Sequence, residues 1–141
     1  MQVDTAIYSL ADAVDRAQEL ESVGFDGVFT FEGPNDVFVP LTLAAAATDL
    51  RVWSNVAIAF PRNPIHLAHT ARDLQELSGG RFVLGLGTQI RTHIERRFGA
   101  GFYRPVHRMS VLIAALRAVF EAWETGEPLS HEGQYYSHTL M

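Results

Sequence analysis

Cysteine and lysine are both absent from the 141 residues, so all 11 basic residues are arginine. Without cysteine the chain can form no disulfide, no thiolate metal site and no thiol nucleophile. Without lysine it can form no Schiff base, and it lacks the lysine of a P-loop. These two absences exclude several classes of enzyme chemistry before any motif is considered, and no metal site is expected.

A long hydrophobic run is also missing. No uninterrupted apolar segment approaches the ~18 residues of a membrane span. The first residues, MQVDTAIY, lack the basic head of a signal peptide. The net charge of −5 disfavours general binding of nucleic acid. With 48% hydrophobic residues, the composition predicts one globular domain over residues 1–141 that is cytoplasmic and binds neither membrane nor nucleic acid.

Along the chain, a segment whose apolar residues have the spacing of a strand is followed by one with the spacing of a helix, and this order occurs four times. Strands are expected near residues 3–8, 25–31, 50–60 and 81–87, and helices near 9–24, 37–48, 64–78 and 105–125. Ser9 and Asp12 form an S-x-x-D start for the first helix. The third and fourth helices carry apolar stripes that include Leu77 and Val106, respectively. The tail after Gly126 has residues typical of a hairpin or loop.

Such βα repetition predicts a parallel sheet with right-handed crossovers. A doubly wound sheet usually has a glycine-rich ligand loop in its first βα turn, but this turn reads YSLAD. A (β/α)8 barrel distributes its ligand loops over many strand ends. The unusual segments FEGPND, AFPRNP and GTQIRTH follow strands two, three and four, which favours the barrel. A complete barrel needs ~200–250 residues, so four units make about half of one.

The stretch RFVLGLGTQ (residues 81–89) runs from a strand into a G-x-G turn. A dinucleotide fingerprint would need a third glycine where Ile90 stands, and it would follow the first strand. Directly afterwards, residues 91–108 contain five arginines, two histidines and one glutamate, hence a net charge of five minus one, or +4. This patch suits an anionic ligand, although a solvated surface of helix and loop is the alternative.

Three stretches resemble the luciferase-like monooxygenase superfamily, and most of all its coenzyme F-420 (deazaflavin)-dependent oxidoreductases. They are A-x-E-x-x-x-x-GFDGVFTFE at 17–32, the run from RNPIHLAHT to LGLGTQ at 62–89, and HIERRFG at 93–99. The resemblance implies the N-terminal half of a TIM barrel of the bacterial-luciferase type. It also implies hydride transfer between coenzyme F-420 and a small organic substrate. An FMN-dependent monooxygenase is the alternative.

The resemblance further implies which residues bind the cofactor. In the family the ring lies over a bulge in strand three that contains a non-proline cis peptide, and the matching pair here is Asn55-Val56. The glycines of the G-x-G turn would keep side chains away from the ring. Arginines would suit the acidic tail of coenzyme F-420. The implied cofactor-binding residues are Asn55, Val56, Arg62, Gly87, Thr88, Gln89 and His93.

No acid or base can be assigned with the same specificity. Relatives often carry a histidine after strand two, where Gly33 stands here, and some carry a glutamate where Ile90 stands. Glu32 and Asp36 are the nearest candidates for proton transfer, and a helix cap is the alternative role for each.

A half-barrel alone leaves sheet edges and an inward face open, which favours pairing. The inward residues are expected to include Val3, Val28, Val56 and Val83. We therefore expect the chain to pair with the missing C-terminal half or with a copy of itself, as a homo-oligomer. A non-catalytic half-barrel that only binds another chain is the second class of function.

Overall fold

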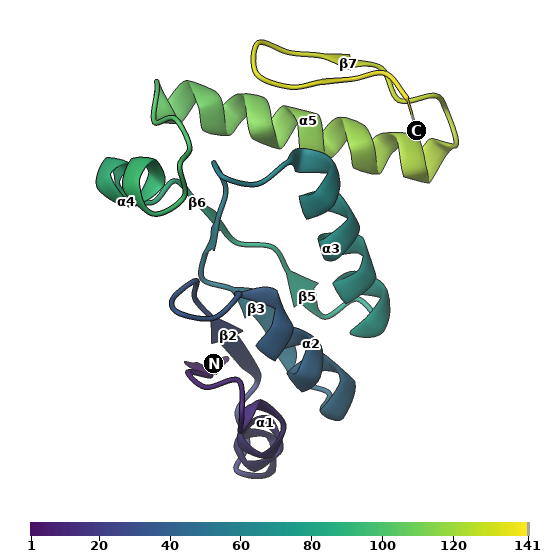
Figure 1. Cartoon of the computed structure of the whole chain (residues 1–141). Coiled ribbons are helices and arrows are strands. Elements are labelled where there is room, and N and C mark those ends of the chain that lie inside the picture. Colours follow the sequence, from purple (N-terminus) through teal and green to yellow (C-terminus); the bar gives the residue numbers. More distant parts are fainter. Residues whose placement is uncertain (141) are drawn as a thin grey trace. The chain divides into compact units, whose positions relative to one another are not determined.

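The computed structural model describes residues 1–140 and divides the chain into two compact units. The first unit comprises Met1–Ala57 and Thr70–Gly87, and the second comprises Ile58–His69 and the chain from Thr88 onward. Figure 1 shows the order of the helices and strands. That residues 1–141 form one domain stays a prediction.

Four parallel strands form the sheet of the first unit. They are β1 (Asp4–Ala6), β2 (Gly27–Thr30), β3 (Arg51–Ser54) and β5 (Phe82–Val83), in the order β1-β2-β3-β5. Between them in sequence lie α1 (Ala13–Ser22), α2 (Phe38–Ala47) and α3 (Pro64–Leu77) (Figure 1). The predicted repetition of strand and helix in a parallel sheet is therefore confirmed.

The strand register gives the two faces of this sheet different surroundings. Val28 is in register with Val52, and Val52 with Phe82; all three are buried. On the same face, Phe38 of α2 packs edge-on against Phe82, with ring centroids 6.5 Å apart. The prediction that Val28 faces water is therefore wrong, because the register places it on the helix-covered face.

The opposite face carries Phe29, Trp53 and Val83, which share one register row. The rings of Phe29 and Trp53 lie 4.9 Å apart, and Val83 is 49% exposed. Parallel sheets are normally covered on both faces because their strands are apolar on both sides. In the first unit, this face is therefore the less covered one.

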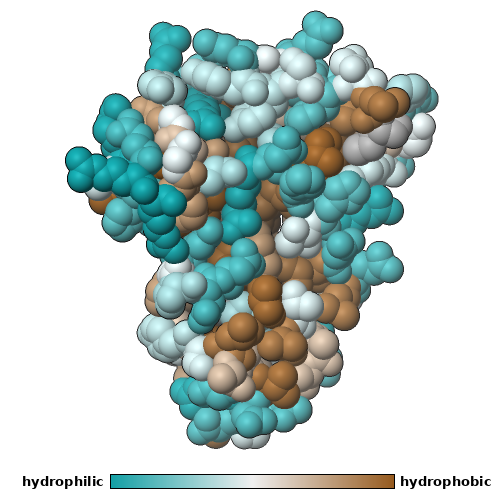
Figure 2. All heavy atoms as spheres, in the orientation of Figure 1, coloured by the Kyte–Doolittle hydropathy of each residue, from teal (hydrophilic) through white to brown (hydrophobic). Residues whose placement is uncertain are grey.

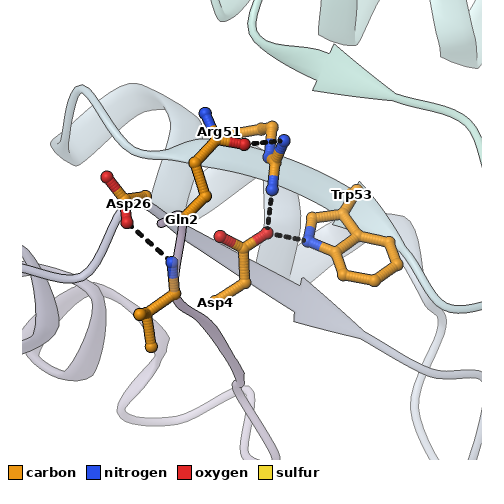
Figure 3. A network of polar contacts seen from close by, with 6 residues as sticks. Gln2, Asp4, Asp26, Arg51 and Trp53 are labelled. Atoms are coloured by element: carbon orange, nitrogen blue, oxygen red, sulfur yellow. Dashed lines mark hydrogen bonds and ion pairs between the residues drawn. The ribbon is translucent and has the colours of Figure 1, made fainter.

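A polar network on the less covered face ties β1 to β3 (Figure 3). The Asp4 Oδ2 atom accepts hydrogen bonds from Arg51 Nη2 at 2.5 Å and from Trp53 Nε1 at 2.9 Å. Gly27 of β2 lies between them, and a Cβ there would meet Arg51 O at 2.8 Å and Asp4 Oδ1 at 2.9 Å. The network thus requires glycine at this position in the middle strand. Trp53, which is only half-buried, is anchored by a hydrogen bond as well as by packing.

Some expected helix details differ from the structure. Helix α1 begins at Ala13, and the side chain of its N-cap residue, Asp12, makes no capping hydrogen bond. Leu77 is 46% exposed and Val106 is 84% exposed, so neither belongs to the buried stripe of its helix. Both lie in an end turn of their helix, where the helical period alone does not decide burial.

The second unit contains two helices and a hairpin of its own. Helix α4 (Arg91–Arg96) is short, whereas α5 (Pro105–Thr125) spans 21 residues. Leu112, Leu116 and Val119 are buried on α5. Strands β7 (His131–Glu132) and β8 (Ser137–His138) pair antiparallel, which confirms the hairpin interpretation of the tail. Among residues 1–140, no helix is long and apolar enough to cross a membrane.

The hairpin holds a histidine pair that predicts a dependence on pH. His131 and His138 are register partners, their rings are stacked 6.5 Å apart, and the Nε2 atom of each is buried without a partner among the described residues. Burial lowers the pKa of His138 below its ordinary value of 6.5, and the nearby His131 lowers this pKa further. The unfolded hairpin therefore binds a proton more readily than the folded one.

We expect the hairpin to keep its full stability above pH 6.5 and to lose part of it as the pH falls from 6.5 through the lower pKa of folded His138. Amide hydrogen exchange of residues 131–138 at several pH values measures this. Replacing both histidines by phenylalanine should flatten the dependence between pH 7.5 and 5. An equally steep profile in that double variant would contradict the assignment.

Candidate functional site

The carboxyl end of β3 is interrupted at the predicted position. The strand ends at Ser54, the peptide bond between Asn55 and Val56 is cis, and β4 (Ala57–Ile58) follows. The prediction of a cis bond at this pair is therefore confirmed. That this pair lies against a cofactor ring stays a prediction.

Hydrogen bonds from two neighbouring segments fix the backbone at this break. Asn55 N donates to Thr30 O at 2.7 Å, and Ala57 N donates to Gly85 O at 2.8 Å. The buried Ser54 hydroxyl donates to Gly85 O and accepts from Gly85 N, each at 2.9 Å. The backbone is thus held on both sides, while the side chain of Asn55 is exposed. A polar side chain on a fixed backbone is a suitable ligand contact.

The two glycines of the G-x-G turn are explained by the neighbouring strand. A Cβ on Gly85 would lie 2.1 Å from Ser54 O. A Cβ on Gly87, in β6 (Leu86–Gly87), would lie 2.3 Å from Val56 Cγ2. The close approach of residues 54–56 therefore requires glycine at both positions. The expected contact of Gly87 with a cofactor stays a prediction.

A small cavity of about 40 Å3 lies beyond the carboxyl ends of β1 and β2. Tyr8 and Phe31 stand at these ends, 77% and 46% exposed, with their rings edge-to-face at 5.8 Å. The Thr30 hydroxyl donates to Val37 O at 2.6 Å and so fixes the loop between β2 and α2. The lining residues are Ile7, Tyr8, Thr30, Phe31, Pro34, Asn35, Asp36 and Pro40.

Both candidate acids lie in this loop. The Asp36 Oδ1 atom accepts a hydrogen bond of 2.8 Å from Phe38 N, in the first turn of α2. Asp36 therefore stabilises the start of this helix, the alternative role considered for it. Glu32 is half-buried in the same loop. A role for either carboxylate in proton transfer stays a prediction.

The second unit holds the other predicted cofactor residues. Gln89 has a φ of 57°, a left-handed conformation that is uncommon outside glycine, and its Oε1 atom accepts a hydrogen bond from Ile90 N at 2.9 Å. This turn leads into α4, where His93 is exposed. Thr88 and Arg62 are half-buried. Left-handed non-glycine residues cluster at functional sites, which draws attention to Gln89.

The arginines of residues 91–108 have different surroundings. Arg91 pairs with Glu95 at 3.2 Å on the surface of α4, and its guanidinium lies 5.2 Å from the centre of the Phe102 ring. Arg96 is exposed on the same helix. These two side chains are accessible to an anion from solvent.

Arg108 has a structural role that the sequence did not reveal. Its guanidinium donates to the carbonyl oxygens of Gly101 and, at 3.0 Å, Phe60, and it lies 4.6 Å from the centre of the Phe60 ring. It therefore joins α5 to two loops of the second unit. No motif signals this role, because the two carbonyls lie 7 and 48 residues away.

Metal ligands are not grouped in the part of the chain that the structure describes, since no three His, Asp or Glu side chains there could hold one ion. The candidate polar residues for a ligand site are Asn55, Glu32 and Asp36 in the first unit, and Gln89, His93 and the arginines in the second.

Comparison with known sequences identifies relatives that are longer than this chain. An uncharacterised protein of Mycobacterium tuberculosis is 50% identical over 133 residues, which are 94% of this chain and 39% of that protein. Another protein of the same organism, provisionally named a coenzyme F-420-dependent oxidoreductase, is 34% identical over 118 residues, 82% of this chain and 33% of that protein. The chain thus matches between 33% and 39% of the length of these two relatives.

Solved structures show the same fold. The oxygenating constituent of 3,6-diketocamphane monooxygenase from Pseudomonas putida, in complex with FMN, matches with a TM-score of 0.83 at 16% identity. The match covers 100% of this chain and 45% of that one. The coenzyme F-420-dependent tetrahydromethanopterin reductase from Methanopyrus kandleri matches with a TM-score of 0.76 at 18% identity, over 99% and 44% of the two chains.

The predicted α/β architecture, about half of a luciferase-type (β/α)8 barrel, is therefore confirmed. The sequence model of the luciferase-like monooxygenases matches residues 1–141, and the chain accordingly belongs to the luciferase-like monooxygenase family.

Proposed function

We propose that this chain is the cofactor-binding part of an oxidoreductase that uses coenzyme F-420 and acts on a small organic substrate. The observation that carries the proposal is the fixed backbone at Ser54–Ala57, which presents the exposed Asn55 side chain at the carboxyl end of β3. The carboxyl ends of barrel strands are where such enzymes build their sites. The bound cofactor would supply the hydride chemistry, and the chain would bind and orient it.

The residues of the first unit fit the ring of such a cofactor. Val56 offers an apolar side chain and Asn55 a polar amide on a backbone that hydrogen bonds hold on both sides. Tyr8 and Phe31 add exposed aromatic surface at the neighbouring strand ends, suitable for an apolar part of the substrate. Glu32 and Asp36 are the acids available to hold or deliver a proton there.

The residues of the second unit fit an anionic tail. Arg91 and Arg96 are exposed on α4, close in sequence to Gln89 and His93. Arginine binds phosphate and carboxylate through paired N–H groups, so this set suits the phosphodiester and glutamates of coenzyme F-420. Arg62, which the resemblance implies as a cofactor-binding residue, remains part of this proposal.

Coenzyme F-420 is preferred over FMN because a relative that is 34% identical carries the name of a coenzyme F-420-dependent enzyme. FMN is the alternative, since a protein of the same fold was solved in complex with it. Titrating the chain with each cofactor, followed by cofactor fluorescence, compares the two affinities directly. Tighter binding of FMN would favour the monooxygenase alternative, and binding of neither would contradict a cofactor role for the chain.

The tail assignment gives a sharper prediction. Replacing Arg91 and Arg96 by alanine should weaken binding of coenzyme F-420 by about tenfold at low salt, since each exposed charge contributes up to ~1 kcal/mol. Binding of riboflavin, which has no charged tail, should change less than about twofold. Fluorescence titration of both ligands at two salt concentrations measures the difference.

Arg117→Ala is the matched control, because Arg117 is exposed on α5 in the same unit but lies outside the arginine-rich segment. It should leave both affinities unchanged. Equal losses for coenzyme F-420 and riboflavin in the double variant would overturn the tail assignment while leaving a ring site intact.

A further inference from the structure

Two aromatic rings beyond the carboxyl ends of β1 and β2 stand steeply inclined to each other. Tyr8 is 77% exposed and Phe31 is 46% exposed, although aromatic side chains usually bury most of their large apolar surface. The ring planes are inclined by 71° and the centroids lie 5.8 Å apart. Two exposed rings at this angle form the corner of an aromatic cage, the arrangement with which proteins bind organic cations.

The cavity beside these rings is too small for a whole organic substrate. Its volume is about 40 Å3. Since a cavity needs about 10–15 Å3 to hold one water molecule, it has room for about three groups of that size. Apart from the two rings, much of its lining is apolar, with Ile7, Pro34 and Pro40. It therefore suits the end of a ligand, such as methyl groups carried on one atom.

The charge at this cavity is negative. Asp36 lines it and Glu32 lies in the same loop, whereas none of the lining residues is basic. The backbone N–H of Phe38 donates to Asp36 Oδ1 at 2.8 Å, which fixes the carboxylate beside the cavity. A cation is therefore attracted to this position, and an anion is repelled.

The surrounding part of the chain strengthens the negative field. Residues 1–50, all in the first unit, contain nine acidic residues and one arginine, hence a net charge of one minus nine, or −8. Three of these acids lie on α1, and Figure 2 shows hydrophilic residues over the region where Figure 1 places this helix. Such a field raises the local concentration of cations and lowers that of anions.

We propose that Tyr8, Phe31 and Asp36 bind an alkylated ammonium group. The faces of the two rings attract the cation through their π-electrons, and the carboxylate neutralises its charge. The alkyl groups fill the cavity that Pro34 and Pro40 line. A strongly hydrated cation, such as a metal ion, fits less well because these apolar walls cannot replace its water molecules.

This inference names a substrate class for the proposed enzyme. The carboxyl ends of the strands are where a barrel enzyme meets its substrate, so the ammonium group would belong to the substrate, an alkylated amine. That assignment rests on the proposed function. The binding of the ammonium group to the chain does not rest on it, and it can be measured without a cofactor.

Choline and its uncharged isostere, 3,3-dimethylbutanol, test the proposal because they share one shape and differ in charge. Chemical shifts of the Tyr8 and Phe31 ring protons, followed during titration of the chain without cofactor, measure both affinities. Choline should bind at least about fivefold more tightly than the isostere. Equal affinities, or no shift of either ring up to about 50 mM choline, would overturn the proposal.

Two substitutions separate the ring from the charge. Phe31→Leu keeps an apolar side chain but removes the ring face, so choline should bind about fivefold more weakly and the isostere should change less than about twofold. Asp36→Asn keeps an oxygen that can accept from Phe38 N but removes the charge, so choline should again bind about fivefold more weakly. Unchanged circular dichroism spectra establish that both variants fold.

Asp49→Asn is the matched control for the charge. Asp49 is exposed beyond the other end of α2, about 15 Å of helix away from Asp36, and its replacement changes the net charge by the same amount. It should alter the affinity for choline less than about twofold. Equal effects of Asp36→Asn and Asp49→Asn would contradict a defined cage. Because no cofactor is present, the cage can fail while the proposed function stands, and the reverse.

Discussion

Gly85→Ala should destabilise the protein by about 3 kcal/mol or more, the upper range for inserting a methyl group into a closely packed site. The added Cβ would lie 2.1 Å from Ser54 O, a backbone atom that cannot rotate away. The same backbone region holds Ser54 and Ala57 through hydrogen bonds to Gly85. The clash would therefore disturb the backbone that presents Asn55. Urea denaturation followed by circular dichroism measures the loss of stability.

Two other glycines give a graded series for this test. At Gly87 the added Cβ would meet the end of the Val56 side chain at 2.3 Å, so a shift of that side chain can relieve part of the clash, and we expect about 1–2 kcal/mol. At Gly33 the nearest atom is Phe31 Cε2 at 3.4 Å, an ordinary contact, so Gly33→Ala should change stability by less than about 0.5 kcal/mol. Equal stability of the Gly85 and Gly33 variants would show that the strands can separate without cost.

The G-x-G turn illustrates how far the sequence reaches. The pattern was sufficient to exclude a dinucleotide fingerprint, because the third glycine and the position in the fold are both wrong. It could not show that Ser54 and Val56 approach the two glycines, because these residues lie about 30 positions away and nothing in a single sequence pairs them. The physical reason for each glycine thus became visible only with the neighbouring strand.

The sequence also leaves open which face of a strand in the parallel sheet points inward. The sequence predicted the strand β2, but both of its faces carry apolar side chains, as is common in parallel sheets. Val28 and Phe29 are therefore equally plausible inward residues from the sequence. The register with Val52 and Trp53 decides between them and places Val28 under α2.

The candidate site was predictable only where a resemblance supplied the positions. The pair Asn55-Val56 and the turn at Gln89 coincide with unusual backbone in the structure. The structural role of Arg108 had no such signal. One arginine among five in a basic segment looks like its neighbours until its carbonyl partners, Gly101 and Phe60, are known.

Helix α2 gives the second prediction with a large effect, since two of its leucines differ only in which side of the helix they occupy. Leu41 is fully buried, whereas Leu43 is 37% exposed. Truncating a buried leucine to alanine removes its transfer free energy and leaves a cavity, at a cost of about 2–5 kcal/mol. We therefore expect Leu41→Ala to lower the free energy of unfolding by about 3 kcal/mol.

Leu43→Ala is the matched control, because it removes the same type of side chain from the exposed side of the helix. Its effect on the stability of the monomer should stay below about 1 kcal/mol, because most of what it removes is already exposed to water. Urea denaturation of the two variants, followed by circular dichroism, measures both effects. Equal losses of stability in the two variants would show that the orientation of α2 described above is wrong.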